Sequence, residues 1–268
     1  MPRGSLHVAV ENAAVDPAVD GIVLVSPHPG QGVLLMNALD PSVTDENDAL
    51  SCDPALDPFS AANGFRRPPE SASYRADFIE RYRAAQRARC ERIDTKARQM
   101  IAAKREALAR NKEHPSRDDK RVASHAPIFQ IWRTDADLRC WDTSLDPSDR
   151  LVGSLWGADP EVSNLGSVGF GRVVTPESWL STWSGLTSNA AMSKTAVAIE
   201  QPMLLIEYTG DNCVFPADVK ALYDSVPSSN KQYRRVRGNH HGLPLAPGEP
   251  NGQEQAGRYL GEWLKATF

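Results

Sequence analysis

The sequence has few cysteines and no long apolar run, and each shortage excludes a class of protein. Its 268 residues include four cysteines, at positions 52, 90, 140 and 213, and no two of them form a C-x-x-C pair. We therefore expect no structural zinc site, and we interpret the four as reduced thiols of a cytoplasmic protein. No apolar run approaches the roughly 18 residues that span a bilayer, so we expect no membrane partner. The first residues, MPRGSLHVAVENAAVD, are too polar for a signal peptide.

An excess of charge of either sign is also missing. The formal net charge is −4, from 30 Lys and Arg against 34 Asp and Glu, and it indicates no polyanionic partner for the chain as a whole. The acid-rich segment Asp45, Glu46 and Asp48 lacks the spacing of a calcium loop, so we predict no metal. What is present is core material, because 41% of the residues are hydrophobic and six are tryptophans. Wholesale disorder is thereby excluded, and the length fits one large domain or a core with a big insertion.

Helix and strand signals alternate near both ends of the chain. Ser5–Ala14 favours a helix, and the continuous apolar run Gly21–Ser26 (GIVLVS) favours a strand buried on both faces. Near the C-terminus two strands alternate with two helices, at Pro202–Tyr208, Pro216–Val226, Gln232–Arg237 and Gln253–Ala266. The arginine-rich second strand of this set should lie nearer an edge. Alternation of this kind predicts an α/β fold with a parallel sheet and right-handed crossovers.

The region between about 40 and 195 breaks that rhythm. Apolar residues at three- and four-residue steps predict a long helix that begins near Ser73 and ends before Pro115. Pro127–Arg133 and Leu138–Asp142 flank a turn-like TDAD segment and predict a hairpin. Asp146-Pro147 is typical of the start of a short helix, with proline at its first position.

Two features of this region have competing interpretations. The long helix is dense in Arg and Lys, which favours a solvated face with intrahelical pairs such as Glu80 with Arg83. A face that attracts an anionic substrate, or a nucleic-acid surface, is less favoured. Trp179 and Trp183 are four residues apart and share a face if the segment is helical. They pack in the core or, alternatively, line an acyl pocket.

An acid and two histidines follow the last two predicted strands. Asp211 comes just after Pro202–Tyr208, and His240 and His241 come just after Gln232–Arg237. Successive parallel strands deliver such residues to one edge of the sheet, where active sites of open α/β sheets lie. A histidine there can move a proton to and from a nucleophile, while a carboxylate holds its other ring N–H. A Gly-Asp turn or a loop histidine alone is common, so the pairing carries the functional hypothesis.

The stretch PMLLIEYTGDNCVFPADVKALYDSV…YRRVRGNHHG resembles the last two strand–loop–helix units of α/β-hydrolases. The resemblance implies that Asp211 is the triad acid and that His241 is the histidine, because Gly238–His241 aligns with G-x-x-H; His240 is the alternative. It also implies hydrolysis of an ester or related acyl bond through a Ser-His-Asp mechanism, without a cofactor. The resemblance further implies that the chain divides into a hydrolase core over 1–39, a mainly helical cap insertion over 40–199 and a hydrolase core over 200–268.

The nucleophile that this resemblance requires has no counterpart in the sequence. G-x-S-x-G does not occur, and the elbow is expected at or upstream of Met1. The sheet is therefore expected to be partial, holding the last three strands, and either a misplaced start or a genuine fragment explains this. Cys213, Ser5, Ser26 and Ser184 are weak replacements. A non-catalytic remnant or binding module is the alternative function, and we expect the chain as given to be inactive.

Two further expectations concern the strand Gly21–Ser26. His28 lies just past its C-terminal end and is either a substrate-binding residue or an ordinary turn histidine between two prolines. The apolar strand itself lacks a predicted neighbour on one side. An uncovered apolar edge is a template for association, so we expect self-association through it.

Overall fold

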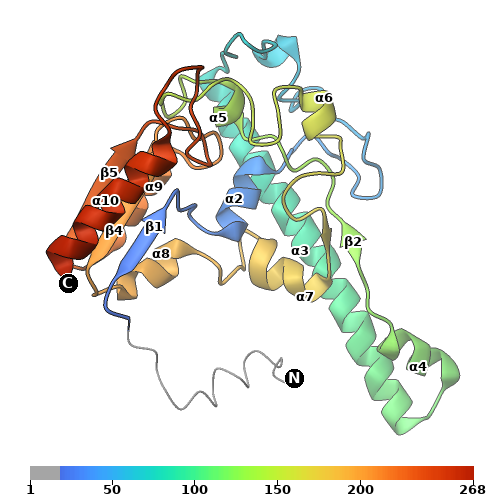
Figure 1. Cartoon of the computed structure of the whole chain (residues 1–268). Helices are drawn as coiled ribbons and strands as arrows, with labels where there is room; N and C mark the ends of the chain where they lie inside the picture. The colour runs from blue at the N-terminus through green and yellow to red at the C-terminus, as the bar shows by residue number, and fades with distance from the viewer. Residues whose placement is uncertain (1–18) are drawn as a thin grey trace.

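The computed structural model describes residues 19–268 and contains a three-stranded parallel sheet; the helix expected over Ser5–Ala14 lies outside the described residues. The strands are β1 (Ile22–Val25), β4 (Met203–Tyr208) and β5 (Lys231–Val236). Their order is β1-β4-β5, and both neighbouring pairs are parallel. β5 is an edge strand, as its arginines predicted. Figure 1 shows β1 on the opposite side of β4, where the chain enters the sheet.

Helices cover the two faces of the sheet. α9 (Pro216–Ser225) packs on Met203 and Leu205 of β4, and α10 (Gly252–Thr267) packs on the alternate residues Leu204 and Ile206. Because successive strand side chains point to opposite faces, covering both faces requires a continuously apolar strand. Every residue of β4 is accordingly buried. The predicted strand–helix–strand–helix order at the C-terminus is therefore confirmed.

The long helix is also confirmed, as α3 (Ala76–Glu113), with bounds within three residues of those expected. Its buried stripe includes Phe78, Tyr82 and Ile93, and it packs against α2 (Gln31–Ala38). At about 1.5 Å per residue, its 38 residues extend some 57 Å. Figure 1 shows its far end leaving the body of the molecule together with α4 (Arg117–Ser124).

One arginine of α3 is neutralised inside the molecule, and others pair nearer the surface. The Arg89 guanidinium is fully buried and donates to the Glu46 carboxylate at 2.9 and 3.0 Å. The expected ion pair of Glu80 with Arg83 is replaced by a longer-range one. Arg83 pairs with Asp137, outside the helix, at 3.1 Å. A surface pair at i,i+4 does form between Arg87 and Glu91. α3 is thus held by ion pairs to the segments around it as well as by its apolar stripe.

Two expectations for the middle region are wrong. The predicted hairpin does not form: β2 (Phe129–Gln130) pairs with β3 (Val173–Val174), and Leu138–Trp141 is a helical turn, α5. Asp137 caps that turn by accepting a hydrogen bond from the backbone of Arg139, which ends the extended segment. No helix follows Asp146-Pro147, where Asp146 itself adopts a left-handed backbone angle.

Short elements complete the described part of the chain. They are η1 (Ala61–Asn63), α6 (Pro160–Ser163), α7 (Pro176–Ser178), η2 (Trp179–Trp183), α8 (Met192–Thr195) and η3 (Ala196–Ala198). η2 is a π-helical turn in which Trp179 is fully buried and donates to Asp94 at 2.7 Å, so this tryptophan is a core residue. None of the helices within residues 19–268 is long and apolar enough to cross a bilayer.

Candidate functional site

Two loops at the C-terminal edge of the sheet bring an acid and a histidine together. β4 ends at Tyr208 and β5 at Val236, so the parallel strands deliver the residues that follow them to the same edge. A hydrogen bond from the Gly210 backbone N–H to the Gly238 carbonyl, at 2.9 Å, joins the loops. Gly210 has little room for a side chain, because a Cβ there would lie 2.9 Å from the backbone carbonyl oxygen of Gly238 in the other loop. The close approach of the two loops therefore depends on this glycine.

The Asp211 carboxylate is buried and lies in hydrogen-bond contact with His240. Nδ1 of His240 is 2.9 Å from Oδ2 of Asp211. This hydrogen bond raises the pKa of His240, although partial burial of the ring opposes the shift. A carboxylate that accepts from Nδ1 fixes the tautomer and leaves Nε2 as the basic nitrogen. The predicted pairing of Asp211 with a histidine is thus present in the geometry.

His241, the histidine favoured by the G-x-x-H alignment, is not the partner of Asp211 in the structure. The two histidines are the central residues of a tight turn over Asn239–Gly242. Gly242 has a left-handed conformation and donates its N–H to the Asn239 carbonyl at 2.7 Å. The turn directs His240 toward Asp211, while His241 is exposed and its backbone N–H bonds the Asn239 side chain. Residue spacing in the G-x-x-H alignment cannot show which of the two adjacent histidine side chains the turn directs toward Asp211.

Asp211 is held by three further hydrogen bonds. Its Oδ1 accepts from the backbone N–H groups of Cys213 and Val214 at 2.7 and 3.0 Å. Its Oδ2 accepts from the hydroxyl of Ser26 at 2.5 Å, so Ser26 and His240 share one oxygen. Four donors around this buried carboxylate fix its orientation. Ser26, one of the weak replacement nucleophiles, donates its hydroxyl proton to the acid in the structure.

The sequence does indicate where Ser26 lies in the sheet. This serine ends the only apolar run near the N-terminus and precedes Pro27, so it lies at the same sheet edge as Asp211. Its backbone φ of 47° is a left-handed value at the point where β1 leaves the sheet. A hydroxyl at that position can reach the acid of the next strand, and strand order alone predicts this contact.

A cavity of about 240 Å³ lies beside the pair. His240 and Asn212 contribute polar groups to its wall, and Leu151, Leu155 and Leu245 contribute an apolar side. Two of these leucines come from residues 40–199 and the rest of the lining from residues 200–268. Small-molecule sites combine an apolar lining with a few polar groups, and this cavity is near the lower end of their size range of roughly 300–1,000 Å³.

His28 lies near the pair but lines a different cavity. It belongs to a groove along β1 rather than to the space beside His240. Burial and then the positive charge of His240 lower the pKa of His28, so its ring favours the neutral form. Its Nδ1 accepts from the Gly30 backbone N–H at 3.1 Å, which places the ring proton on Nε2. A role for His28 in substrate binding remains a prediction.

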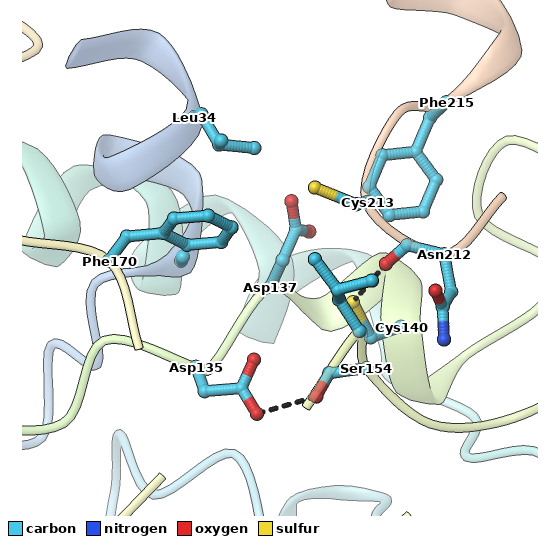
Figure 2. Close-up of a pocket in the computed structure, with 11 residues that line it drawn as sticks. Leu34, Asp135, Asp137, Cys140, Ser154, Phe170, Asn212, Cys213 and Phe215 are labelled. Atoms are coloured by element: carbon cyan, nitrogen blue, oxygen red, sulfur yellow. Dashed lines mark hydrogen bonds between the residues drawn. The ribbon is translucent and has the colours of Figure 1, made fainter. Parts of the chain in front are cut away.

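A second small cavity, drawn in Figure 2, lies beside the Asp211 loop, and its lining includes two cysteines and two aspartates. Its space is about 20 Å³, room for roughly one water molecule. Burial raises the pKa values of Cys213 and Cys140 well above that of a free thiol, so neither is a reactive thiolate. Burial also raises the pKa of Asp135, whose carboxylate accepts from Ser154 at 2.6 Å (Figure 2). This cavity is a packing feature.

The residues that the structure describes supply no nucleophile for this acid–histidine pair. Within residues 19–268, no hydroxyl or thiol forms a hydrogen bond with Nε2 of His240. Over the same range, no three His, Cys, Asp or Glu side chains cluster as metal ligands would. The site is therefore an acid–histidine pair with a free basic nitrogen beside a cavity.

Comparisons with models of protein families, with curated proteins and with solved structures found no match to this chain.

Proposed function

We propose that the Asp211–His240 pair belongs to an α/β-hydrolase-like acyl hydrolase, which cleaves an ester or a related acyl bond through a Ser-His-Asp mechanism. In this proposal the serine lies outside residues 19–268. The observation that carries the proposal is the 2.9 Å contact between Nδ1 of His240 and the buried Asp211 carboxylate, at the C-terminal edge of a parallel sheet.

The pair supports a defined sequence of proton movements. Nε2 of His240 takes the proton of the serine hydroxyl as its oxygen attacks the carbonyl carbon. The imidazolium then gives this proton to the leaving alkoxide, and the acyl group stays on the serine. Water enters in the same way, deprotonated by His240, and the acid product leaves as the serine recovers its proton. Asp211 orients His240 during these steps and stabilises the imidazolium.

The cavity beside His240 favours small substrates. Its space of about 240 Å³ fits a short acyl group, and the leucine side chains at positions 151, 155 and 245 provide apolar contact for it. The side-chain amide of Asn212 is a polar group in the same wall. We therefore infer a short-chain ester in preference to a long-chain lipid.

A non-catalytic remnant or binding module is the second candidate. The free Nε2 of His240, which has no hydroxyl or thiol partner within residues 19–268, favours it for this polypeptide alone. Without a nucleophile an Asp–His pair has nothing to activate, and loss of one triad member removes most of the rate. We expect the 268-residue chain to hydrolyse p-nitrophenyl acetate and butyrate no faster than buffer.

The decisive experiment compares this chain with one extended upstream along its natural reading frame. We expect the extended chain to hydrolyse p-nitrophenyl butyrate and to react with a fluorophosphonate, which labels activated serines. His240→Gln should abolish both signals, whereas the matched variant His241→Gln should keep most of the activity. An extended chain that is folded yet inert, or an upstream frame closed by a stop codon, would reject the hydrolase and leave the remnant. Turnover by the 268-residue chain that survives His240→Gln would exclude both candidates.

A further inference from the structure

β1 presents a strand edge that no other strand within residues 19–268 covers. It pairs with β4 on one side and stands at the end of the sheet order (Figure 1). A groove of about 500 Å³ runs along it, lined by the strand from Val23 to His28 and by residues 190–192 and Thr195. Natural edge strands are usually protected by charge, proline or a covering segment. The residues of this strand from Gly21 to Ser26 include no charge and no proline.

The hydrogen bonds to β4 identify which backbone groups face outward. Ile22 donates its N–H to the Pro202 carbonyl at 2.9 Å, and Ser26 donates to the Ile206 carbonyl at 2.8 Å. In a parallel strand the residues whose N–H and C=O face one neighbour alternate with those that face the other. Leu24 therefore faces β4 as well, and the N–H and C=O groups of Val23 and Val25 point away from the sheet. Gly21 has the same orientation.

The surroundings of this edge suit a second copy of the chain. Residues 21–27 carry no ionisable side chain, so two such edges meet without repulsion between like charges. Val25 is 47% exposed beside the groove, and Val19 is 50% exposed at the other end of the strand. Phe268, also exposed, lies against Gly21. Association would remove these apolar side chains from water.

We propose that β1 pairs antiparallel with β1 of a second copy, about a two-fold axis at Val23. The outward groups at odd-numbered positions pair best when Val23 faces Val23 of the second copy and Gly21 faces its Val25. No other antiparallel register uses all three outward-facing residues on both strands. The resulting sheet has six strands and a two-fold axis at its centre.

This pairing is independent of the proposed hydrolase function, because it uses only the strand edge. The pairing also gives β1 a neighbour on the side that no other strand within residues 19–268 covers. The register makes a specific prediction about distances. Facing residues of an antiparallel hydrogen-bonded pair have Cα atoms about 5.5 Å apart, within the range that a disulfide bridges. The two Val25 residues are offset by four positions along the strands, roughly 13 Å, which is too far.

The test uses the full chain with Cys52→Ser, which removes the exposed thiol. We expect sedimentation velocity at tens of micromolar to show a dimer. Oxidation should cross-link the Val23→Cys variant nearly completely, and the Leu24→Cys and Val25→Cys variants weakly or not at all. Val25→Pro removes an outward N–H that β4 does not use and should weaken the dimer at least tenfold. Val25→Thr keeps that N–H and the β-branch, and should leave the dimer intact.

Three results would overturn the proposal. One is a wild-type chain that stays monomeric at these concentrations, because the edge of β1 then does not pair with a second copy. Another is cross-linking that is strongest at position 24 or 25, which would indicate a different register or a different interface. The third is a dimer that a folded Val25→Pro variant leaves unweakened. If circular dichroism shows that this variant is unfolded, the pattern across the three cysteine positions decides alone.

Discussion

Removing the Ser26 hydroxyl should change both the stability of the chain and the titration of His240. The hydroxyl donates at 2.5 Å to Oδ2 of Asp211, a carboxylate whose side chain is 1% exposed. Hydrogen bonds to charged groups contribute about 1.5–3 kcal/mol to stability, and no solvent can replace the lost donor at a buried oxygen without entering the site. We therefore expect Ser26→Ala to lower the free energy of unfolding by about 1.5–3 kcal/mol.

The direction of the effect on His240 follows from the shared oxygen. Ser26 and His240 both bond Oδ2 of Asp211, so the serine competes with the imidazole for the same negative charge. Without the serine the carboxylate depends more on the imidazolium, and the pKa of His240 should rise further.

Urea denaturation and an NMR titration of the histidine Cε1 protons measure the two effects. Ser181→Ala, which removes an exposed hydroxyl, is the matched control and should change stability by no more than about 0.5 kcal/mol. A Ser26→Ala protein with unchanged stability and an unchanged His240 titration would refute the four-donor description of the Asp211 site.

Other expectations concern the same pair and the middle region. The pKa of His240 is raised in the folded state, so its pairing with Asp211 stabilises fully below the unfolded pKa of about 6.5 and less as pH rises through the folded value. His240→Gln should thus cost more stability at pH 5.5 than at pH 8.5 in urea unfolding, and an equal cost at both would contradict this. Arg89→Met removes the buried partner of Glu46, which keeps only the part-exposed Arg92, and removes the donor to the Asp40 and Trp132 carbonyls. It should cost about 3–5 kcal/mol, against no more than about 0.5 for the exposed Arg87→Met, by the same assay. Trp179→Phe removes the donor to buried Asp94 and should lower the free energy of unfolding by about 1–3 kcal/mol, whereas an unaffected protein would mean that this contact is dispensable.

The sheet and the position of the site were predictable from sequence because their signals are local. The apolar runs at 21–26 and 202–208 are long enough to specify strands, and parallel strands deliver their following loops to one edge. Asp211 could be chosen on that ground together with the two histidines that follow the next strand. The long helix was predictable for the same reason, since its period of apolar residues persists over about eight turns.

What could not be predicted depends on contacts between distant residues. The choice between His240 and His241 depends on a turn closed by Gly242, which spacing does not reveal. The extended segment at Phe129 pairs with Val174, more than 40 residues later, so the prediction of a hairpin with the neighbouring segment was wrong. The partner of Arg89 likewise lies 43 residues away, at Glu46. Local patterns specify elements, and tertiary contacts specify partners.

The ring protonation of the two adjacent histidines tests the central claim most directly. Long-range ¹⁵N–¹H NMR of the 268-residue chain reports which imidazole nitrogen carries the proton. We predict that neutral His240 is protonated on Nδ1, that its pKa is above the ordinary value, and that Asp211→Asn abolishes both features. His240 protonated on Nε2, or the same two features found on His241 instead, would contradict the assignment of Asp211 and His240 as the acid–base pair.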